Sequence, residues 1–267
     1  MSSRKYLWVS IFLIGLLVSI ACSAGDLSTA ADMGDLEALI PLPELPSLNV
    51  KEIKGSGELA QESRILRDIR EVELSGIGSL HIELGEEEGL RIEAEDNLVQ
   101  YFRLDINKDK LRIGLQPGVR LAPTLPVDYY LTVKDLKAIT LSGSGSIQVN
   151  NWTGRYVEMT LAGSGDIQVK DLNVQSAKVK IPGSGNITVS GVVQEQDITI
   201  GGSGSYLAAA LESGKTRAKI EGSGSVEVRT LDVLNVSISG SGSVRYTGNP
   251  DIRENISGAG QLVKLEG

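Results

Sequence analysis

A short glycine motif that returns about every 19 residues constrains this 267-residue chain more than any other feature of its sequence. Gly-Ser-Gly or a close variant begins at residues 143, 163, 183, 202, 222, 240 and 258, so the interval is always 18 to 20 residues. A fixed period of this length is typical of repeat architectures, in which one unit of structure stacks on the next.

Apolar and polar residues alternate on both sides of each glycine motif. Ile139 and Leu141 precede the first copy, Ile147 and Val149 follow it, and the later copies repeat these positions. A period of two is typical of a β-strand with one buried face, so each repeat predicts two strands. The residue nine positions after the first glycine is also apolar in five copies and is expected to be buried: Trp152, Leu172, Val192, Leu211 and Leu231.

Two strands per repeat, with equivalent residues about 19 positions apart, predict an all-β parallel solenoid of seven coils. Each strand would pair in register with its counterpart in the next coil, at a spacing of about 4.8 Å. A sandwich of antiparallel hairpins is the rival fold, but it has no need for the same internal offset in every repeat. Aromatic residues make up only 4% of the chain, so the core must be mainly aliphatic.

The glycine motifs are expected to form the corners of the coils. Glycine reaches positive φ without a steric penalty and lets neighbouring backbones approach closely, while the middle serines would stack and bond backbone groups. A phosphate-binding loop is a weak alternative, because no helical pattern and no Gly-Lys-Ser/Thr follows any copy. The predicted corner residues are Gly143, Ser144, Gly145, Gly163, Ser164, Gly165, Gly183, Ser184, Gly185, Gly202, Ser203, Gly204, Gly222, Ser223, Gly224, Gly240, Ser241 and Gly242.

The first 21 residues are predicted to be a lipoprotein signal peptide. Arg4 and Lys5 precede an apolar run, and the segment Val18-Ser19-Ile20-Ala21-Cys22 resembles the bacterial lipobox, in which cleavage leaves a lipid-bearing cysteine. Cys22 is therefore the predicted lipidation site. It is the only cysteine, which excludes a disulfide within the chain. A plain secretory peptide and an uncleaved anchor are the alternatives.

Residues 22–61 are predicted to be a flexible linker, because they are acidic and contain prolines at 41, 43 and 46. A short helix over 27–39 is an option within it. The folded domain is predicted over 62–267, with strands from Ile69. Alternating runs at 90–94 and 111–115 predict further strands, 107–110 a turn, and the proline-containing segment 116–126 an irregular excursion.

Residues 64–265 resemble the bacterial auto-transporter adhesin family built on the head GIN domain. The resemblance is carried by IREVELSGIGSLHIELGEEEGLRIEAEDNLVQYFRLDINKDKLRIGL, by VDYYLTVKDLKAITLSGSGSIQV and by the Gly-Ser-Gly coils that follow. It implies a right-handed β-helix on an exported protein or lipoprotein. It supplies no catalytic residues to carry over.

Composition and motifs argue against several function classes. Loss of Arg4 and Lys5 lowers the formal net charge from −8 to about −10, which disfavours binding to nucleic acid. No metal or cofactor site is expected, since His81 is the only histidine and should point outward into solvent. The acidic turn 86–88 is expected to be a solvated loop.

A β-helical polysaccharide lyase or hydrolase is the alternative function. Such enzymes need stacked carboxylates on an outer face, but the outward positions after the motifs hold no repeated aspartate pair: Gln148, Gln168, Thr188, Glu227 and Arg245. The sequence therefore favours a lipid-anchored cell-envelope protein, outside the cytoplasm, whose repetitive surface binds a glycan or a surface protein. A purely structural role in the envelope is equally compatible with the residues.

Overall fold

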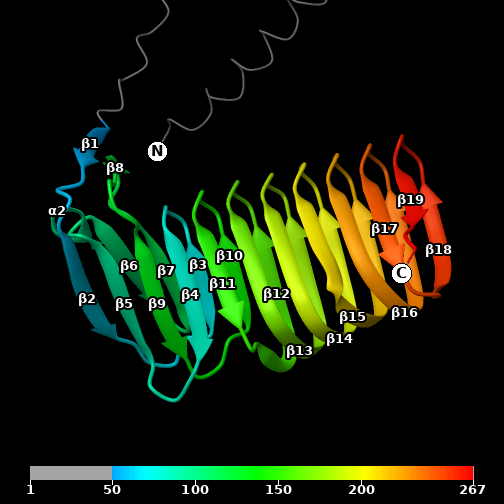
Figure 1. The fold of residues 1–267 in the computed structure, drawn as a ribbon, viewed down its shortest axis with the longest axis horizontal. Coiled ribbons are helices and arrows are strands. Elements are labelled where there is room, and N and C mark those ends of the chain that lie inside the picture. Colours follow the sequence, from blue (N-terminus) through cyan, green and yellow to red (C-terminus); the bar gives the residue numbers. More distant parts are fainter. Residues whose placement is uncertain (1–49, 267) are drawn as a thin grey trace, which may run out of the picture. The chain divides into compact units, whose positions relative to one another are not determined.

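The computed structural model describes residues 50–266, which form a β-solenoid of about six turns (Figure 1). Strands account for 66% of the described residues and helix for 2%. The predicted signal peptide 1–21, Cys22, the optional helix 27–39 and most of the predicted linker lie outside the described residues. Among the residues described, no helix has the length and hydropathy needed to span a membrane.

Parallel strands build the coils and lie side by side along the molecule in Figure 1. They are β3 (Glu71–Leu74), β4 (Ser79–Leu84), β7 (Lys110–Leu115), β9 (Asp128–Val133), β10 (Ala138–Leu141), β11 (Ser146–Asn150), β12 (Thr153–Leu161), β13 (Asp166–Ile181), β14 (Asn186–Ile200), β15 (Ser205–Ile220), β16 (Ser225–Ile238), β17 (Ser243–Thr247), β18 (Asp251–Ile256) and β19 (Gln261–Lys264).

The coils pair in parallel and in the register that the repeat predicts. Ile147 of β11 lies opposite Ile167 of β13, which lies opposite Ile187 of β14. Leu80 of β4 is the partner of Ile147 on its other side, although 67 positions separate the two residues in the chain. These residues are all fully or almost fully buried, so they form one of the aliphatic stacks that fill the interior. The solenoid prediction is confirmed, with about six turns in place of the seven coils expected.

At one end of the solenoid, edge strands extend the sheet beyond the first coils, and much of their pairing is antiparallel. We call this region the cap. Strand β5 pairs with β2 and β9, and β6 pairs with β7, in antiparallel ladders, whereas β1 and β8 form a separate parallel pair. The elements of this cap are β1 (Lys51–Lys54), β2 (Leu59–Ile65), β5 (Gly89–Glu95), α2 (Asp96–Val99), β6 (Phe102–Asn107) and β8 (Val119–Ala122).

Two expectations change in the cap. Residues 51–54 and 59–61 form strand instead of linker, because the sheet edges of β8 and β5 supply hydrogen-bond partners for them. The excursion 116–126 likewise contains strand β8. The turn expected at 107–110 connects β6 to β7, with Lys108 in the left-handed conformation (φ 57°).

Close backbone approach, rather than positive φ, explains the corner glycines. None of those from Gly143 to Gly242 has a positive φ; Gly78, in the variant motif between β3 and β4, does (φ 95°). A Cβ atom added at Gly165 would lie less than 3.0 Å from the carbonyl oxygen of Gly145, one coil earlier, and the same holds at the other corners. The expectation of positive φ was therefore wrong, and that of close approach is confirmed.

Two of the five residues nine positions after the glycine are exposed instead of buried. Val192 is 53% exposed and Leu231 is 43% exposed. The registers shift at both places: Gly191 takes the inward position opposite Leu172, and Thr230 is buried in place of Leu231. These coils have fewer residues at the bend than the earlier ones. Counting nine positions from the first glycine therefore predicts the wrong face for the side chains of Val192 and Leu231.

A polar network interrupts the aliphatic interior near β14, β15 and β16. The hydroxyl of Tyr206 donates to Oε1 of Gln196 (2.9 Å), and Nε2 of Gln196 donates to Oγ1 of Thr216 (3.1 Å). Thr216 also contacts the hydroxyl oxygens of Ser213 (2.8 Å) and Thr230 (2.7 Å). All five side chains are buried, so each hydrogen bond compensates part of a desolvation cost.

Glu95 connects the cap to its small β1–β8 sheet. Its buried carboxylate accepts hydrogen bonds from the amides of Gly57 (2.7 Å) and Thr124 (2.9 Å) and from the Thr124 hydroxyl (2.5 Å). Burial by itself would raise the pKa of Glu95, but these hydrogen bonds, with a longer one from Leu125, outweigh burial and hold the pKa below its ordinary value.

Gly165→Ala should destabilise the fold by about 1–3 kcal/mol, because the added methyl group forces neighbouring coils apart. Chemical denaturation of the full chain measures this change. Gly154→Ala is the matched control, since no atom lies within 4 Å of its added Cβ, and it should leave stability almost unchanged. Equal effects of the two substitutions would contradict the close-approach explanation.

Glu95→Gln should weaken the cap and flatten its dependence on pH. The folded-state pKa of Glu95 is lowered, so its ionised form stabilises the cap above the ordinary carboxyl pKa of about 4.3. That contribution is lost as the pH falls through the folded-state pKa. Hydrogen exchange of β1 and β8 amides at neutral and acidic pH measures the effect. Glu52→Gln, at an exposed position of β1, is the control, and identical pH profiles for both variants would refute this role.

Candidate functional site

The outer surface of β5, β9 and β4 carries a cluster that no single segment of sequence contains. Antiparallel pairing places Arg91 of β5 opposite Tyr130 of β9, and parallel pairing places His81 of β4 on the other side of Tyr130. All three side chains point away from the core, because they alternate with buried residues along their strands. We call these three residues the ridge.

The side chains of the ridge are stacked in a row. The guanidinium carbon of Arg91 lies 4.1 Å from the centre of the Tyr130 ring, which is a cation–π geometry. The His81 ring lies 5.0 Å from the Tyr130 ring and is inclined to it by 16°. Arg91 also forms an ion pair with Glu93, and Nε2 of His81 lies 3.4 Å from Oδ1 of Asp128. Contacts on both sides therefore fix the orientation of Tyr130.

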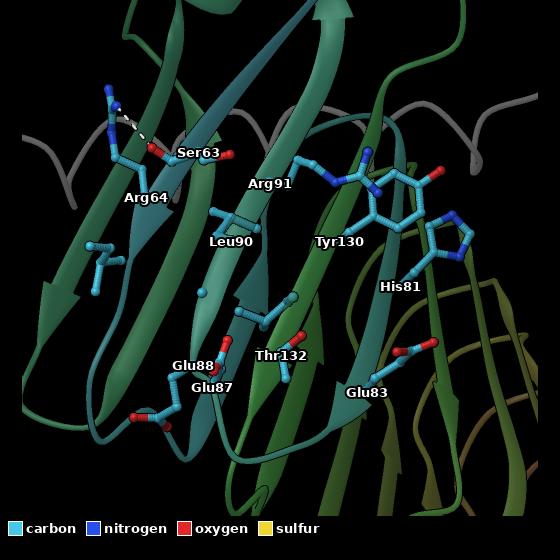
Figure 2. Close-up of a pocket in the computed structure, with 13 residues that line it drawn as sticks. Ser63, Arg64, His81, Glu83, Glu87, Glu88, Leu90, Arg91, Tyr130 and Thr132 are labelled. Atoms are coloured by element: carbon cyan, nitrogen blue, oxygen red, sulfur yellow. Dashed lines mark hydrogen bonds between the residues drawn. The ribbon is translucent and has the colours of Figure 1, made fainter.

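A trough of about 770 Å³ lies beside the ridge (Figure 2). It is open to solvent and is lined by the ridge, by Gly89 and Thr132, which pair with each other across β5 and β9, and by the three carboxylates of Glu83, Glu87 and Glu88. In Figure 2, Arg91, Tyr130 and His81 stand side by side, with Thr132 and the glutamates toward the other end of the hollow.

The glutamates around the trough differ in how far they are already engaged. The carboxylate of Glu88 accepts hydrogen bonds from the amides of Asp68 (2.6 Å) and Lys134 (3.5 Å), which holds the loop between β4 and β5. Within residues 50–266, the carboxylates of Glu83 and Glu87 have neither an ion pair nor a hydrogen bond to protein. Two acceptor groups at the trough are thus free to contact a ligand.

The predicted corner serines do not contribute to the trough. Ser144, Ser164, Ser184, Ser203, Ser223 and Ser241 are exposed at the coil corners. Except at Ser203, their amides rather than their hydroxyls make the contacts between coils: the amide of Ser164, for example, donates to the carbonyl oxygen of Gly143 (3.3 Å). No hydroxyl hydrogen bond from these six serines occurs within the described domain, so the expectation that their hydroxyls bond backbone groups was wrong.

The outward residues expected from the repeats form one row that continues from the ridge. His81 pairs with Gln148, which pairs with Gln168, and the register continues to Thr188, Leu207, Glu227 and Arg245. His81 is outward, as predicted, but it stacks on Tyr130 instead of standing alone. Sequence reasoning missed Arg91 and Tyr130 as its partners, and the only available signal was the alternation that makes both residues outward.

The part of the chain that the structure describes contains no group of three or more His, Cys, Asp or Glu side chains able to hold a metal ion. The chemistry available at the trough is hydrogen bonding by carboxylates, a guanidinium, a phenol and an imidazole. These groups surround an open hollow whose walls are held by neighbouring contacts. The arrangement is suited to binding a polar molecule at the surface.

Known structures share this fold. A "putative adhesin" from Bacteroides fragilis is 19% identical, with a TM-score of 0.75, and the match covers 80% of this chain and 100% of that one. A "putative lipid binding protein" from Parabacteroides distasonis is 24% identical, with a TM-score of 0.70 and coverage of 81% and 100%. A "putative adhesin" from Parabacteroides merdae is 21% identical, with a TM-score of 0.62 and coverage of 80% and 99%.

No curated protein is significantly similar to the chain in sequence. A family model described as "Putative auto-transporter adhesin, head GIN domain" matches residues 68–250, which include the ridge and the coils as far as β17. The match covers more than half of the chain, as the opening segment and the glycine coils led us to expect. The chain therefore belongs to the head GIN domain family of auto-transporter adhesin-like proteins.

Proposed function

We propose that this protein is an exported, lipid-anchored, adhesin-like binding protein of the cell envelope, without catalytic activity, and that its trough binds a glycan. The observation that carries the proposal is the ridge of Arg91, Tyr130 and His81 beside the free carboxylates of Glu83 and Glu87. Family membership supports an adhesin-like role at the surface or envelope.

The chemistry of the trough matches the hydroxyl groups of a sugar. Carboxylates accept hydrogen bonds from hydroxyls, and the guanidinium of Arg91 and the phenol of Tyr130 donate to them. Both faces of the Tyr130 ring are covered by Arg91 and His81, so we expect its hydroxyl end, rather than its ring face, to meet the ligand. Because the ridge is already ordered by these contacts, binding loses little side-chain entropy.

A lipid acyl chain fits the trough less well, although one structural relative is named for lipid binding. An acyl chain gains affinity by burying apolar surface. The trough offers one exposed apolar side chain, Ile65, but Arg64, Arg91, Glu83, Glu87 and Glu88 also line it. Their charged groups would lose water to an acyl chain without gaining hydrogen bonds. Sugar hydroxyls replace that water and keep the charged groups hydrogen-bonded.

Cleavage of a polysaccharide is the second candidate function. Histidine and tyrosine are both able to transfer protons, and here His81 and Tyr130 lie together on the outer face of a β-helix. Binding without cleavage is favoured because the family model is described as an adhesin, and so are two of the structural relatives.

Tyr130→Ala and Arg91→Ala should each weaken glycan binding about tenfold or more, because each removes a member of the ridge at the centre of the site. Binding of the full chain to a glycan array, followed by calorimetry with the glycans retained, measures the loss. Tyr156→Ala is the matched control: Tyr156 is an exposed tyrosine of β12 outside the trough, and its loss should leave binding unchanged.

Three outcomes of these experiments would count against the proposal. If no glycan is retained, or if the Tyr156 variant loses affinity as the Tyr130 variant does, the trough is not a glycan site. If retained glycans are shortened during incubation, and the His81→Ala variant no longer shortens them, the protein is an enzyme.

Lipid anchoring rests on the sequence Val18-Ser19-Ile20-Ala21-Cys22 and on the single cysteine. Cys22→Ser should abolish incorporation of a clickable fatty acid and release the protein from the membrane fraction, since one thiol is the predicted attachment point. Fluorescence of the labelled chain after electrophoresis measures incorporation. Ser19→Ala is the control, because it keeps the thiol. Undiminished labelling of the Cys22 variant would exclude this anchor.

A further inference from the structure

A second, smaller hollow lies on the same outer face as the trough, farther along the solenoid. Its volume is about 280 Å³, and its lining includes Gln168, Thr188 and Leu207 of the outward row, together with Lys170, Ser190 and Ala209. Ser190 and Ala209 have short side chains, which accounts for the depression.

The two hollows lie on the same side of one continuous row of side chains. Thr132, in the trough, is two positions after Tyr130 of the row; Ser190 and Ala209, in the second hollow, are two positions after Thr188 and Leu207. Residues two positions apart on a strand face the same way, so the hollows are aligned along the solenoid axis. Strands β9 and β14 are four pairings apart, a distance of about 19 Å.

The charges along this row and its two hollows disfavour a polyanion as the ligand. Arg91 is paired with Glu93, and Arg245 of the row is paired with Glu227, so these two cations are already neutralised. Within residues 50–266, Lys170 has no ion-pair partner, but Glu83 and Glu87 of the trough have none either. An uncharged polysaccharide avoids repulsion by these carboxylates and still forms hydrogen bonds with the side-chain amides and hydroxyls of the row.

We propose that the ligand is a linear, uncharged polysaccharide that lies along the solenoid axis and occupies the trough and the second hollow together. This inference rests on the proposed function and specifies the shape and charge of the ligand. It follows that a ligand long enough to bridge about 19 Å gains contacts that a disaccharide lacks.

The test is a titration of the full chain with two uncharged series, cello-oligosaccharides and fully N-acetylated chito-oligosaccharides, from disaccharide to octasaccharide. Affinity should rise with length until the sugar reaches the second hollow and should then level off. Ala209→Arg fills that hollow at an exposed position. It should lower the affinity for the longer oligosaccharides about tenfold, which removes the gain with length, and should leave the affinity for the disaccharide unchanged. Ser190→Arg is a second variant with the same expected result.

Gln175→Arg is the control for added charge, because this exposed position of β13 lies outside both hollows. Two results would show that the ligand does not occupy both hollows, while leaving the trough as a glycan site. One is an affinity that does not depend on ligand length, and the other is a gain in affinity with length that persists in both hollow-filling variants. Tighter binding of a hyaluronan series that weakens with added salt overturns the assignment of an uncharged ligand. Absence of binding by every series refutes this inference, whereas the glycan array separately tests the proposed function.

Discussion

The approach of each corner glycine to the carbonyl oxygen of a glycine one coil earlier sets how closely the backbones stack. Amides such as that of Ser164 can reach the coil before them only because no Cβ lies between the two backbones. The strands that leave each corner inherit this spacing, and their parallel ladders follow in register. The aliphatic stacks and the outer row of side chains both depend on it, since a wider gap would separate every buried pair.

The coils were predictable because every repeat states the same pattern of apolar and polar residues. Ile147, Ile167 and Ile187 stand at one offset from their glycines and are stacked in the structure. Val192 and Leu231 show where such counting fails: a bend that is shorter by one or more residues changes the face of a side chain, and a repeat average hides this change. The cap was less predictable, because its antiparallel pairings do not follow the repeat.

The candidate site was only partly predictable, since its residues meet through those cap pairings. His81 was expected to be outward, and the row from Gln148 to Arg245 was expected from the repeats. Arg91 and Tyr130 lie beside His81 because β5 runs antiparallel to β9 and β9 pairs with β4. The alternation of apolar and polar residues indicates that their side chains point outward, but it does not indicate which residues lie next to them. The trough thus forms where the regular coils meet the irregular end, a place that is unique in an otherwise repetitive surface.

The buried network around Gln196 also gives the stack an identity that its aliphatic layers lack. Coils with interchangeable Ile and Val residues could pair one step out of place at little cost during folding. Such a slip would set Gln196 beside Leu234 instead of Thr216 and leave a buried amide unsatisfied, at a cost of about 1–3 kcal/mol. The network thereby distinguishes the coils of β14, β15 and β16 from the purely aliphatic ones and favours their correct pairing.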